Sequence, residues 1–193
     1  MTVAARAPVT RILGIDPGSR YTGYGVIESG GGKSRCLASG VIKLGEGALP
    51  PRLLRLQQEL GAVIGEFRPD EVAMEQVFVK RNVASALVLG EARGVALVTV
   101  AAAGLGVHEY APASIKLAIA GNGRAEKPQV QHMVKLLLNL SKALPEDASD
   151  ALACALCHAH SRVLTQSTAR ALAQARTQTR PQTRPQTRPG ARA

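Results

Sequence analysis

Aromatic residues are scarce in this 193-residue chain, which contains three Tyr, two Phe and no Trp. Since hydrophobic residues still make up 46% of the sequence, the chain is able to bury a core, and that core must be aliphatic and rich in alanine. The three cysteines are too few, and odd in number, for the disulfide framework of a small secreted domain. These absences predict a globular protein from a reducing compartment.

Long uncharged apolar runs are also missing. The longest candidate, residues 94–107, has 14 residues, which is the length of a buried helix rather than of a membrane span of about 20 residues. The start of the chain carries Arg6 and Arg11 with no hydrophobic region between them and a cleavage site, unlike a secretory signal. We therefore expect a cytoplasmic protein with no membrane partner.

Acidic residues are absent from position 161 onward, where the chain carries seven arginines. Residues 1–160 hold 17 basic and 14 acidic residues, so most of the net charge of +10 lies in the C-terminal part. A basic tail on a nearly neutral domain is typical of a protein with a polyanionic partner, here nucleic acid.

The tail also repeats Gln-Thr-Arg-Pro three times between Gln178 and Pro189. A proline at every fourth position prevents both helix formation and strand pairing, and a segment with few apolar residues has no surface to bury. We predict a loose leader over residues 1–10, one folded domain over residues 11–165, and a disordered basic tail over residues 166–193.

The pattern of the predicted elements indicates an α/β fold. Apolar runs and turn signals predict three successive strands, which favours an antiparallel meander, and strands then alternate with helices. This order predicts a mixed five-stranded sheet with later strands parallel and with helices on both faces. The expected strands are 12–15, 22–28, 37–43, 72–74 and 107–110; the expected helices are 53–67, 82–103 (buried), one opening at 112, one around 130–138 and one from about 147 to 163.

Carboxylates follow two of these strands. Asp16 and Glu75 each end an apolar run, and side chains at strand ends of α/β sheets meet in the crevice where ligands bind. Asp147 and Asp150 lie three residues apart at a helix start and can face the same way. Two carboxylates 4 Å apart repel by about 4 kcal/mol at an effective dielectric constant of 20, so four together need cations.

Oxygen ligands alone favour Mg²⁺ or Mn²⁺ over zinc, and two such ions can hydrolyse a phosphodiester. In a basic chain this pattern indicates a metal-dependent nuclease. Each acid also has an ordinary structural explanation. Asp16 precedes a Pro-Gly turn, Glu75 can end a surface strand, and Asp147 with Asp150 is close to a helix capping box.

Five local strings, in order over roughly residues 11–162, resemble the RuvC family of bacterial Holliday junction resolvases. Together they are far more specific than any one of them. They are Ile12-Leu-Gly-Ile-Asp16-Pro-Gly-Ser-Arg20-Tyr-Thr-Gly-Tyr-Gly-Val26, Glu75-Gln-Val-Phe78, Glu91-Ala-Arg-Gly94, Ala125-Glu-Lys127-Pro-Gln-Val-Gln-His132-Met133, and Asp147-Ala-Ser-Asp150-Ala-Leu-Ala153.

The resemblance implies a ribonuclease H-like fold and a homodimer with two Mg²⁺ per active site, with Mn²⁺ as an alternative. It implies that each dimer resolves a four-way DNA junction by paired, symmetric nicks that leave a 5′-phosphate and a 3′-hydroxyl, in recombination and repair. It also implies a partnership with the RuvA–RuvB branch-migration complex. The metal-binding catalytic acids that it implies are Asp16, Glu75, Asp147 and Asp150.

The same resemblance implies residues that contact DNA. Phe78 corresponds to an aromatic residue near unpaired bases, where stacking is worth about 1–3 kcal/mol per base, and it is followed by the basic residues Lys80 and Arg81. Lys116 and Lys127 correspond to lysines near the scissile phosphate. Lys127 also fits an ordinary place at a helix start on the solvated face. The helix over residues 82–103 is implied at the dimer interface, although its near-total lack of charge, with only Glu91 and Arg93, fits plain burial equally well.

Other functions fit the sequence less well. Cys154-Ala-Leu-Cys157-His158 matches a haem-attachment pattern, but it lies in a predicted helix, so apolar packing of both cysteines is favoured and no haem is expected. A metal site made by these residues and His160 is disfavoured, because residues of one helix cannot all face one ion. Asp16-Pro-Gly also fits ATP-binding sugar kinases, but a second Asp-x-Gly is missing. A junction-binding protein without catalysis is disfavoured by the presence of all four acids.

Overall fold

The computed structural model describes residues 9–76 and 83–178, with ten helices and strands in that part of the chain. Residues 1–161 form one compact unit and residues 162–193 a second, and the sheet and the sites discussed below belong to the first. The strands are β1 (Thr10–Asp16), β2 (Tyr21–Gly30), β3 (Lys33–Lys43), β4 (Glu71–Glu75) and β5 (Val107–Tyr110). The helices are α1 (Leu49–Phe67), α2 (Val83–Ala102), α3 (Pro112–Ala120), α4 (Lys127–Leu137) and α5 (Glu146–Gln178).

The five strands form one mixed sheet in the order β3-β2-β1-β4-β5. β1, β2 and β3 pair antiparallel, whereas β4 pairs parallel with both β1 and β5. β2 and β3 are joined by Gly31 and Gly32, whose φ angles of 60° and 76° are typical of a tight type I′ hairpin turn that favours glycine at both positions. The predicted mixed sheet with an antiparallel meander is confirmed.

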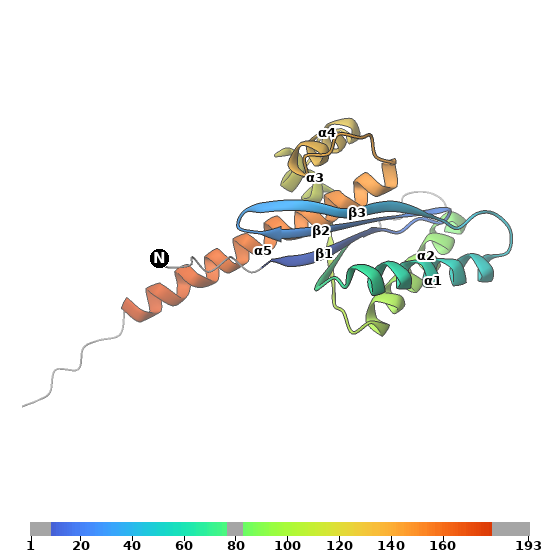
Figure 1. The fold of residues 1–193 in the computed structure, drawn as a ribbon, viewed down its shortest axis with the longest axis horizontal. Helices are drawn as coiled ribbons and strands as arrows, with labels where there is room; N and C mark the ends of the chain where they lie inside the picture. Colours follow the sequence, from blue (N-terminus) through green and yellow to red (C-terminus); the bar gives the residue numbers. More distant parts are fainter. Residues whose placement is uncertain (1–8, 77–82, 179–193) are drawn as a thin grey trace, which may run out of the picture. The chain divides into compact units, whose positions relative to one another are not determined.

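Helices cover both faces of this sheet (Figure 1). Since side chains alternate along a strand, odd and even positions of β1 enter different cores. Leu13 and Ile15 pack with α1 and α2, and Ile12 packs with α3, α4 and α5. The prediction of helices on both faces is also confirmed, and the two cores are almost wholly aliphatic, as the composition indicates.

The helices begin and end where the sequence provides signals for it. Prolines occupy the first turns of α1, α3 and α4, where the missing N–H costs nothing. α1 ends at Arg68 and α3 at Gly121, both in the left-handed conformation, with their N–H groups donating to the carbonyls of Ile64 and Leu117. Pro69 then prevents continuation of α1.

α2 differs from the buried helix that we expected. Among its residues, Ala92, Ala96, Thr99 and Val100 are buried, while other apolar side chains are exposed. It is also the one described helix that is long and apolar enough to cross a membrane by length and composition, a test that core and interface helices pass as well. The scarcity of charge, with Glu91 and Arg93 as the charged residues of α2, therefore reflects in part an apolar surface that a single chain leaves open. Its strongly exposed apolar residues are Val83, Leu87 and Val98.

The last helix is longer than predicted. α5 continues to Gln178, so residues 166–178 are helical where we expected disorder. This stretch is made largely of Ala, Gln, Arg and Leu, which are good helix formers, and the first proline of the repeats comes only at Pro181. The remaining residues of the tail lie outside the described part of the chain.

α5 packs very closely on the centre of the sheet. A Cβ added to Gly14 would lie 1.9 Å from the carbonyl oxygen of Ala151, and one added to Gly25, its partner on β2, would lie 2.6 Å from Leu152. Because α5 presents Ala151 and Ala155 at this contact, small residues on both sides bring helix backbone against strand backbone.

We expect Gly14→Ala to destabilise the protein by about 3 kcal/mol or more, because the new methyl group overlaps the α5 backbone. Urea denaturation measures this change. Gly65→Ala on α1 is the matched control: apart from its chain neighbours and the nearby backbone of its own helix, no atom lies within 4 Å of the added Cβ, and the loss of glycine from a helix should stabilise by about 0.5–1 kcal/mol. A Gly14→Ala protein as stable as the wild type would contradict the close contact.

Candidate active site

Two carboxylates are placed at one edge of the sheet by neighbouring parallel strands. Asp16 ends β1 and Glu75 ends β4, and the register pairs Ile15 with Met74. Because alternate residues share a face, Asp16 and Glu75 point to the side covered by α5.

The first turns of α5 bring two more carboxylates to the same place. On β2, Gly23 pairs with Asp16, and a Cβ added to Gly23 would lie 2.0 Å from the carbonyl oxygen and 3.0 Å from the Cβ of Asp147. Asp147 therefore lies directly over the strand next to Asp16. Asp150 follows three residues later on the same helix face. We call Asp16, Glu75, Asp147 and Asp150 the acidic cluster.

The structure does not place Asp147 as a helix cap. α5 begins at Glu146, so Asp147 lies inside the first turn. Carboxylates in the first turn are stabilised by the partial positive charge of the helix N-terminus. Asp147 therefore does not act as the cap residue of α5. Its negative charge still stabilises the helix through the partial positive charge of the helix N-terminus.

A cavity of about 190 Å³ opens beside the acidic cluster. Lys127, at the start of α4, places its Nζ 2.7 Å from Oδ2 of Asp150 and also pairs with Glu146. Two acids and two lysines thus face one space. The lining residues are Glu75, Pro112, Ile115, Lys116, Lys127, Val130, Asp150 and Ala153.

Crowding of negative charge is strongest at Asp16. Burial, together with the charges of Asp150, Glu75 and Asp147, raises the pKa of its carboxyl to about 7, against a lowering effect of Lys127. A carboxyl with this pKa is about half protonated at neutral pH. The other three carboxylates of the cluster all act on Asp16, which shows that they lie within electrostatic range of it.

The neighbouring groups respond in the same way. Burial raises the pKa of Glu75 and of Asp150, and Lys127 opposes the rise at both. Desolvation works to lower the pKa of Lys127 itself, but its hydrogen bonds to Asp150 and Glu146 outweigh this and raise the pKa above its ordinary value. Lys127 therefore stays charged and supplies part of the positive charge that the cluster needs.

The chemistry of the cluster fits divalent metal ions. Its donors are carboxylate oxygens only, which suits hard cations such as Mg²⁺ or Mn²⁺. The raised pKa of Asp16 shows that one ammonium group does not balance the acids, so additional positive charge would stabilise the ionised form. The donor chemistry and charge of the acidic cluster therefore fit the kind of metal ion that the sequence predicted.

The other predicted residues divide into two groups. Lys116 and Lys127 both line the cavity beside the acids. Phe78, Lys80 and Arg81 lie outside the described residues. Glu146 was missed, since nothing in its sequence context distinguishes it from an ordinary acid at a helix start.

The cysteines do not form a ligand set with histidine. Cys154 and Cys157 are both free and buried, and both belong to the aliphatic core around α5. Burial raises the pKa of both thiols, that of Cys157 to about 11, so they are protonated at neutral pH. This agrees with apolar packing of the two cysteines.

Comparison with known families identifies the same region of the chain. Residues 12–158 match the family model described as crossover junction endodeoxyribonuclease RuvC. Curated relatives of that name come from Marinobacter nauticus, 54% identical over 82% of this chain and 89% of that protein, and from Halorhodospira halophila, 55% identical over 84% of this chain and 99% of that protein.

Solved structures give a matching result. Thermus thermophilus RuvC in complex with a Holliday junction substrate superimposes with a TM-score of 0.77 at 36% identity, over 81% of this chain and 96% of that chain. The yeast mitochondrial Holliday junction resolvase Ydc2 has a TM-score of 0.61 at 16% identity, over 81% of this chain and 80% of that one, which shows the fold alone.

The raised pKa of Asp16 predicts how stability depends on pH. The folded state holds a proton to about pH 7, whereas an unfolded Asp loses it near pH 3.9. The metal-free protein should therefore lose stability as pH rises from about 4 to 7, by at most about 4 kcal/mol through this group. Asp16→Asn should weaken that dependence and be more stable than the wild type at pH 8.

Thermal denaturation in EDTA between pH 5 and pH 8 measures this. Glu66→Gln, which alters an exposed acid on α1, is the control and should follow the wild type. Equal pH dependence of Asp16→Asn and wild type would contradict the placement of Asp16 among like charges.

Proposed function

The chain belongs to the RuvC family of crossover junction endodeoxyribonucleases, and on that premise we propose that its acidic cluster carries out the cutting of four-way DNA junctions. Its fold is the ribonuclease H-like fold of these resolvases, and it is a Holliday junction resolving nuclease. The observation that supports the proposed site is the meeting of four acids from β1, β4 and α5 beside a cavity lined by two lysines.

Asp16, Glu75, Asp147 and Asp150 are the groups that would hold two Mg²⁺ ions, with Mn²⁺ as an alternative. Such ions lower the pKa of an attacking water and neutralise the leaving oxygen of a phosphodiester. Hydrolysis with the 3′ oxygen as the leaving group would give one strand end with a 5′-phosphate and the other with a 3′-hydroxyl.

The chain's own cations would hold the scissile phosphate. Lys116 and Lys127 both face the cavity that contains Glu75 and Asp150. Lys127 is tied to Asp150 and Glu146 in the free protein, so its ammonium group is already fixed beside the acids, and fixed charge costs little reorganisation when a phosphate binds. Phe78, Lys80 and Arg81 are proposed to contact DNA near the crossover.

The site predicts metal-dependent nicking of an immobile four-way junction in Mg²⁺ or Mn²⁺, as paired cuts that are absent on linear duplex of the same sequence. Asp16→Asn should lower the rate at least about 100-fold, because loss of a ligand costs more than the 10–100-fold typical of groups that only support one. Junction binding should persist, since the substitution removes a negative charge.

Glu66→Gln serves again as the acid-to-amide control and should cut normally. Cutting by Asp16→Asn at the wild-type rate would show that the acidic cluster is not the active site. Binding of the junction without cutting in either metal would leave the chain a junction-recognition protein.

The apolar surface of α1 and α2 supports the homodimer. Leu87 and Val98 on α2 and Leu54 on α1 are 64%, 68% and 54% exposed, and a shallow hollow of about 570 Å³ lies between the two helices. Contiguous exposed apolar surface of this kind marks an interaction site. We propose that a second copy of the chain covers it. The hollow is lined by Leu53, Leu54, Gln57, Glu91, Gly94, Val95 and Val98.

Val98→Glu should convert a dimer into a monomer of 20.2 kDa, because the interface would bury an unpaired charge. Sedimentation equilibrium measures the mass. Leu136→Glu, at a similarly exposed apolar residue of α4, should leave the dimer intact. A wild-type chain that sediments as a monomer, or a dimer that survives Val98→Glu, would refute this interface.

The basic tail is proposed to add attraction for DNA phosphates without sequence preference. Deletion of residues 166–193 should reduce the slope of log binding constant against log salt by about 0.9 for each phosphate that the tail neutralises. Fluorescence anisotropy on junction DNA, over a range of salt concentrations from about 50 to about 200 mM, measures the slope. An unchanged slope would assign the arginines another role.

Two further proposals follow from family membership. We propose that the protein is cytoplasmic, because its relatives are bacterial enzymes that act on DNA. Cell fractionation with an antibody to the full chain tests this. A partnership with RuvA–RuvB is tested by co-sedimentation of the three proteins on junction DNA, where independent binding would count against it.

A further inference from the structure

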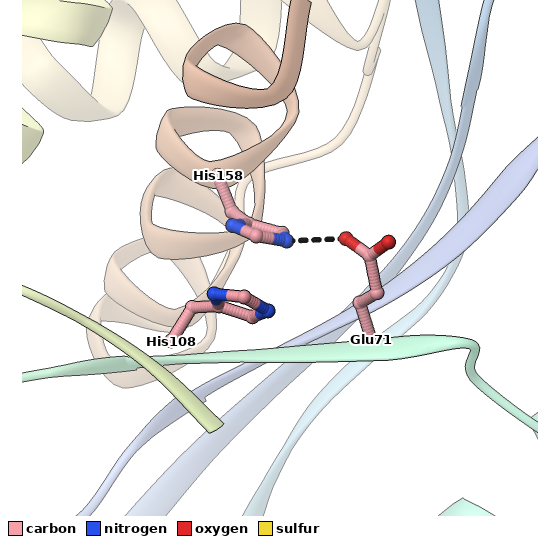
Figure 2. Close-up of side chains that lie close together, drawn as sticks. All are labelled: Glu71, His108 and His158. Carbon is pink, nitrogen blue, oxygen red and sulfur yellow. Dashed lines mark hydrogen bonds and ion pairs between the residues drawn. The ribbon is translucent and has the colours of Figure 1, made fainter. Parts of the chain in front are cut away.

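A second polar cluster lies away from the acidic cluster, on the edge of the sheet. It consists of Glu71, His108 and His158 (Figure 2). Their nitrogen and carboxylate oxygen atoms lie within 4.8 Å of one another, which no other histidine, cysteine or acidic trio in the described part of the chain matches. Glu71 begins β4, His108 lies on the edge strand β5, and His158 lies on α5, so the three meet only through the fold.

The strand register explains why they meet. β5 pairs with β4 so that His108 lies beside Ala73, and alternate positions put Glu71, Ala73 and Glu75 on the face covered by α5. Glu71 and Glu75 are about 13 Å apart along the strand at about 3.3 Å per residue. His158 and Asp150 are about 12 Å apart along the helix at about 1.5 Å per residue. The second cluster therefore lies between β4 and α5, as the acidic cluster does, but at the opposite end of β4.

The two histidines pack against each other, and the buried one has a polar partner at each ring nitrogen. Nε2 of His158 lies 2.5 Å from Oε2 of Glu71, and its other ring nitrogen, Nδ1, lies 2.6 Å from the hydroxyl of Tyr110. The His108 ring stacks on the His158 ring with centroids 4.2 Å apart and stays exposed, while His158 is 2% exposed. Figure 2 shows both rings beside the Glu71 carboxylate.

We propose that Glu71, His108 and His158 bind a zinc ion. Two imidazoles and one carboxylate form a ligand set of zinc sites that keep a fourth position for water, and the exposed side at His108 leaves room for that water. A hydrogen bond from the non-ligating ring nitrogen is what orients a metal-binding histidine, and Tyr110 supplies such a partner to His158. Ligand atoms of a tetrahedral zinc ion are about 3.3 Å apart. Nε2 of His158 and Oε2 of Glu71, now 2.5 Å apart, would therefore need to separate by less than about 1 Å to bind the same ion.

The donor set distinguishes this site from the acidic cluster. Imidazole nitrogens bind zinc well and Mg²⁺ poorly, whereas the four carboxylates favour Mg²⁺. A zinc ion here would join the edge strand β5 to β4 and α5. Because β4 and α5 also carry Glu75 and Asp150, the ion would stabilise the frame of the active site without taking part in DNA cutting.

The test is to measure zinc binding by the full chain with titration calorimetry and with NMR of the imidazole nitrogens. Excess Mg²⁺ is present throughout, so that it occupies the proposed site at the acidic cluster. We expect one zinc per chain, shifts of the His108 and His158 signals, and a higher Tm with zinc. His108→Ala, which truncates an exposed residue, should weaken binding at least about 10-fold, and Glu71→Gln should weaken it as well.

His132→Ala is the matched control, because His132 is exposed on α4 away from the cluster, and it should bind zinc as the wild type does. His108→Ala should still nick junctions in Mg²⁺ without zinc, which separates this proposal from the proposed active site. Absence of zinc binding would overturn the proposal and leave a hydrogen-bonded Glu–His–Tyr chain. Equal binding by His108→Ala and wild type, or shifts confined to other residues, would also overturn it.

Discussion

The contact of α5 with the middle of the sheet is the constraint on which the rest of the structure depends. Backbone meets backbone at Gly14 and Gly23, where no side chain fits. This contact fixes how deep α5 lies and therefore where Asp147 and Asp150 are held relative to the strand ends. The same packing places His158, Asp147 and Asp150 relative to the sheet, because a straight helix has a fixed rise per residue.

The close packing of α5 on the sheet also explains the raised pKa values of carboxyls in the acidic cluster. The acids are brought together by backbone packing that does not yield to their repulsion, so the repulsion changes their proton affinities instead. Lys127 moderates this through Asp150 and Glu146. The repulsion lowers the stability of the fold where the proposed chemistry needs concentrated negative charge, a compromise that is common at functional sites.

Much of this arrangement could be predicted from sequence, because its determinants are local. Asp16 and Glu75 end apolar runs, and strand order gives their common edge. The exposure of α2 could not be predicted, since a mostly apolar helix has the same sequence pattern whether a core or a partner covers it. Glu71 and His108 escaped notice for a different reason: they are 37 residues apart and carry no pattern, so only the parallel pairing of β4 and β5 reveals them. In α5, helix-forming composition extended the helix past the point where apolar periodicity ends.

The protonated state of Asp16 has a consequence for how metal ions are taken up. A carboxyl with a pKa of about 7 must release its proton before both of its oxygens can serve as ligands. At the proposed metal site, cation binding would therefore also release a proton from Asp16 to the solvent. If Asp16 holds a metal ion as proposed, this buried acid at the end of β1 makes metal binding by the protein depend on pH.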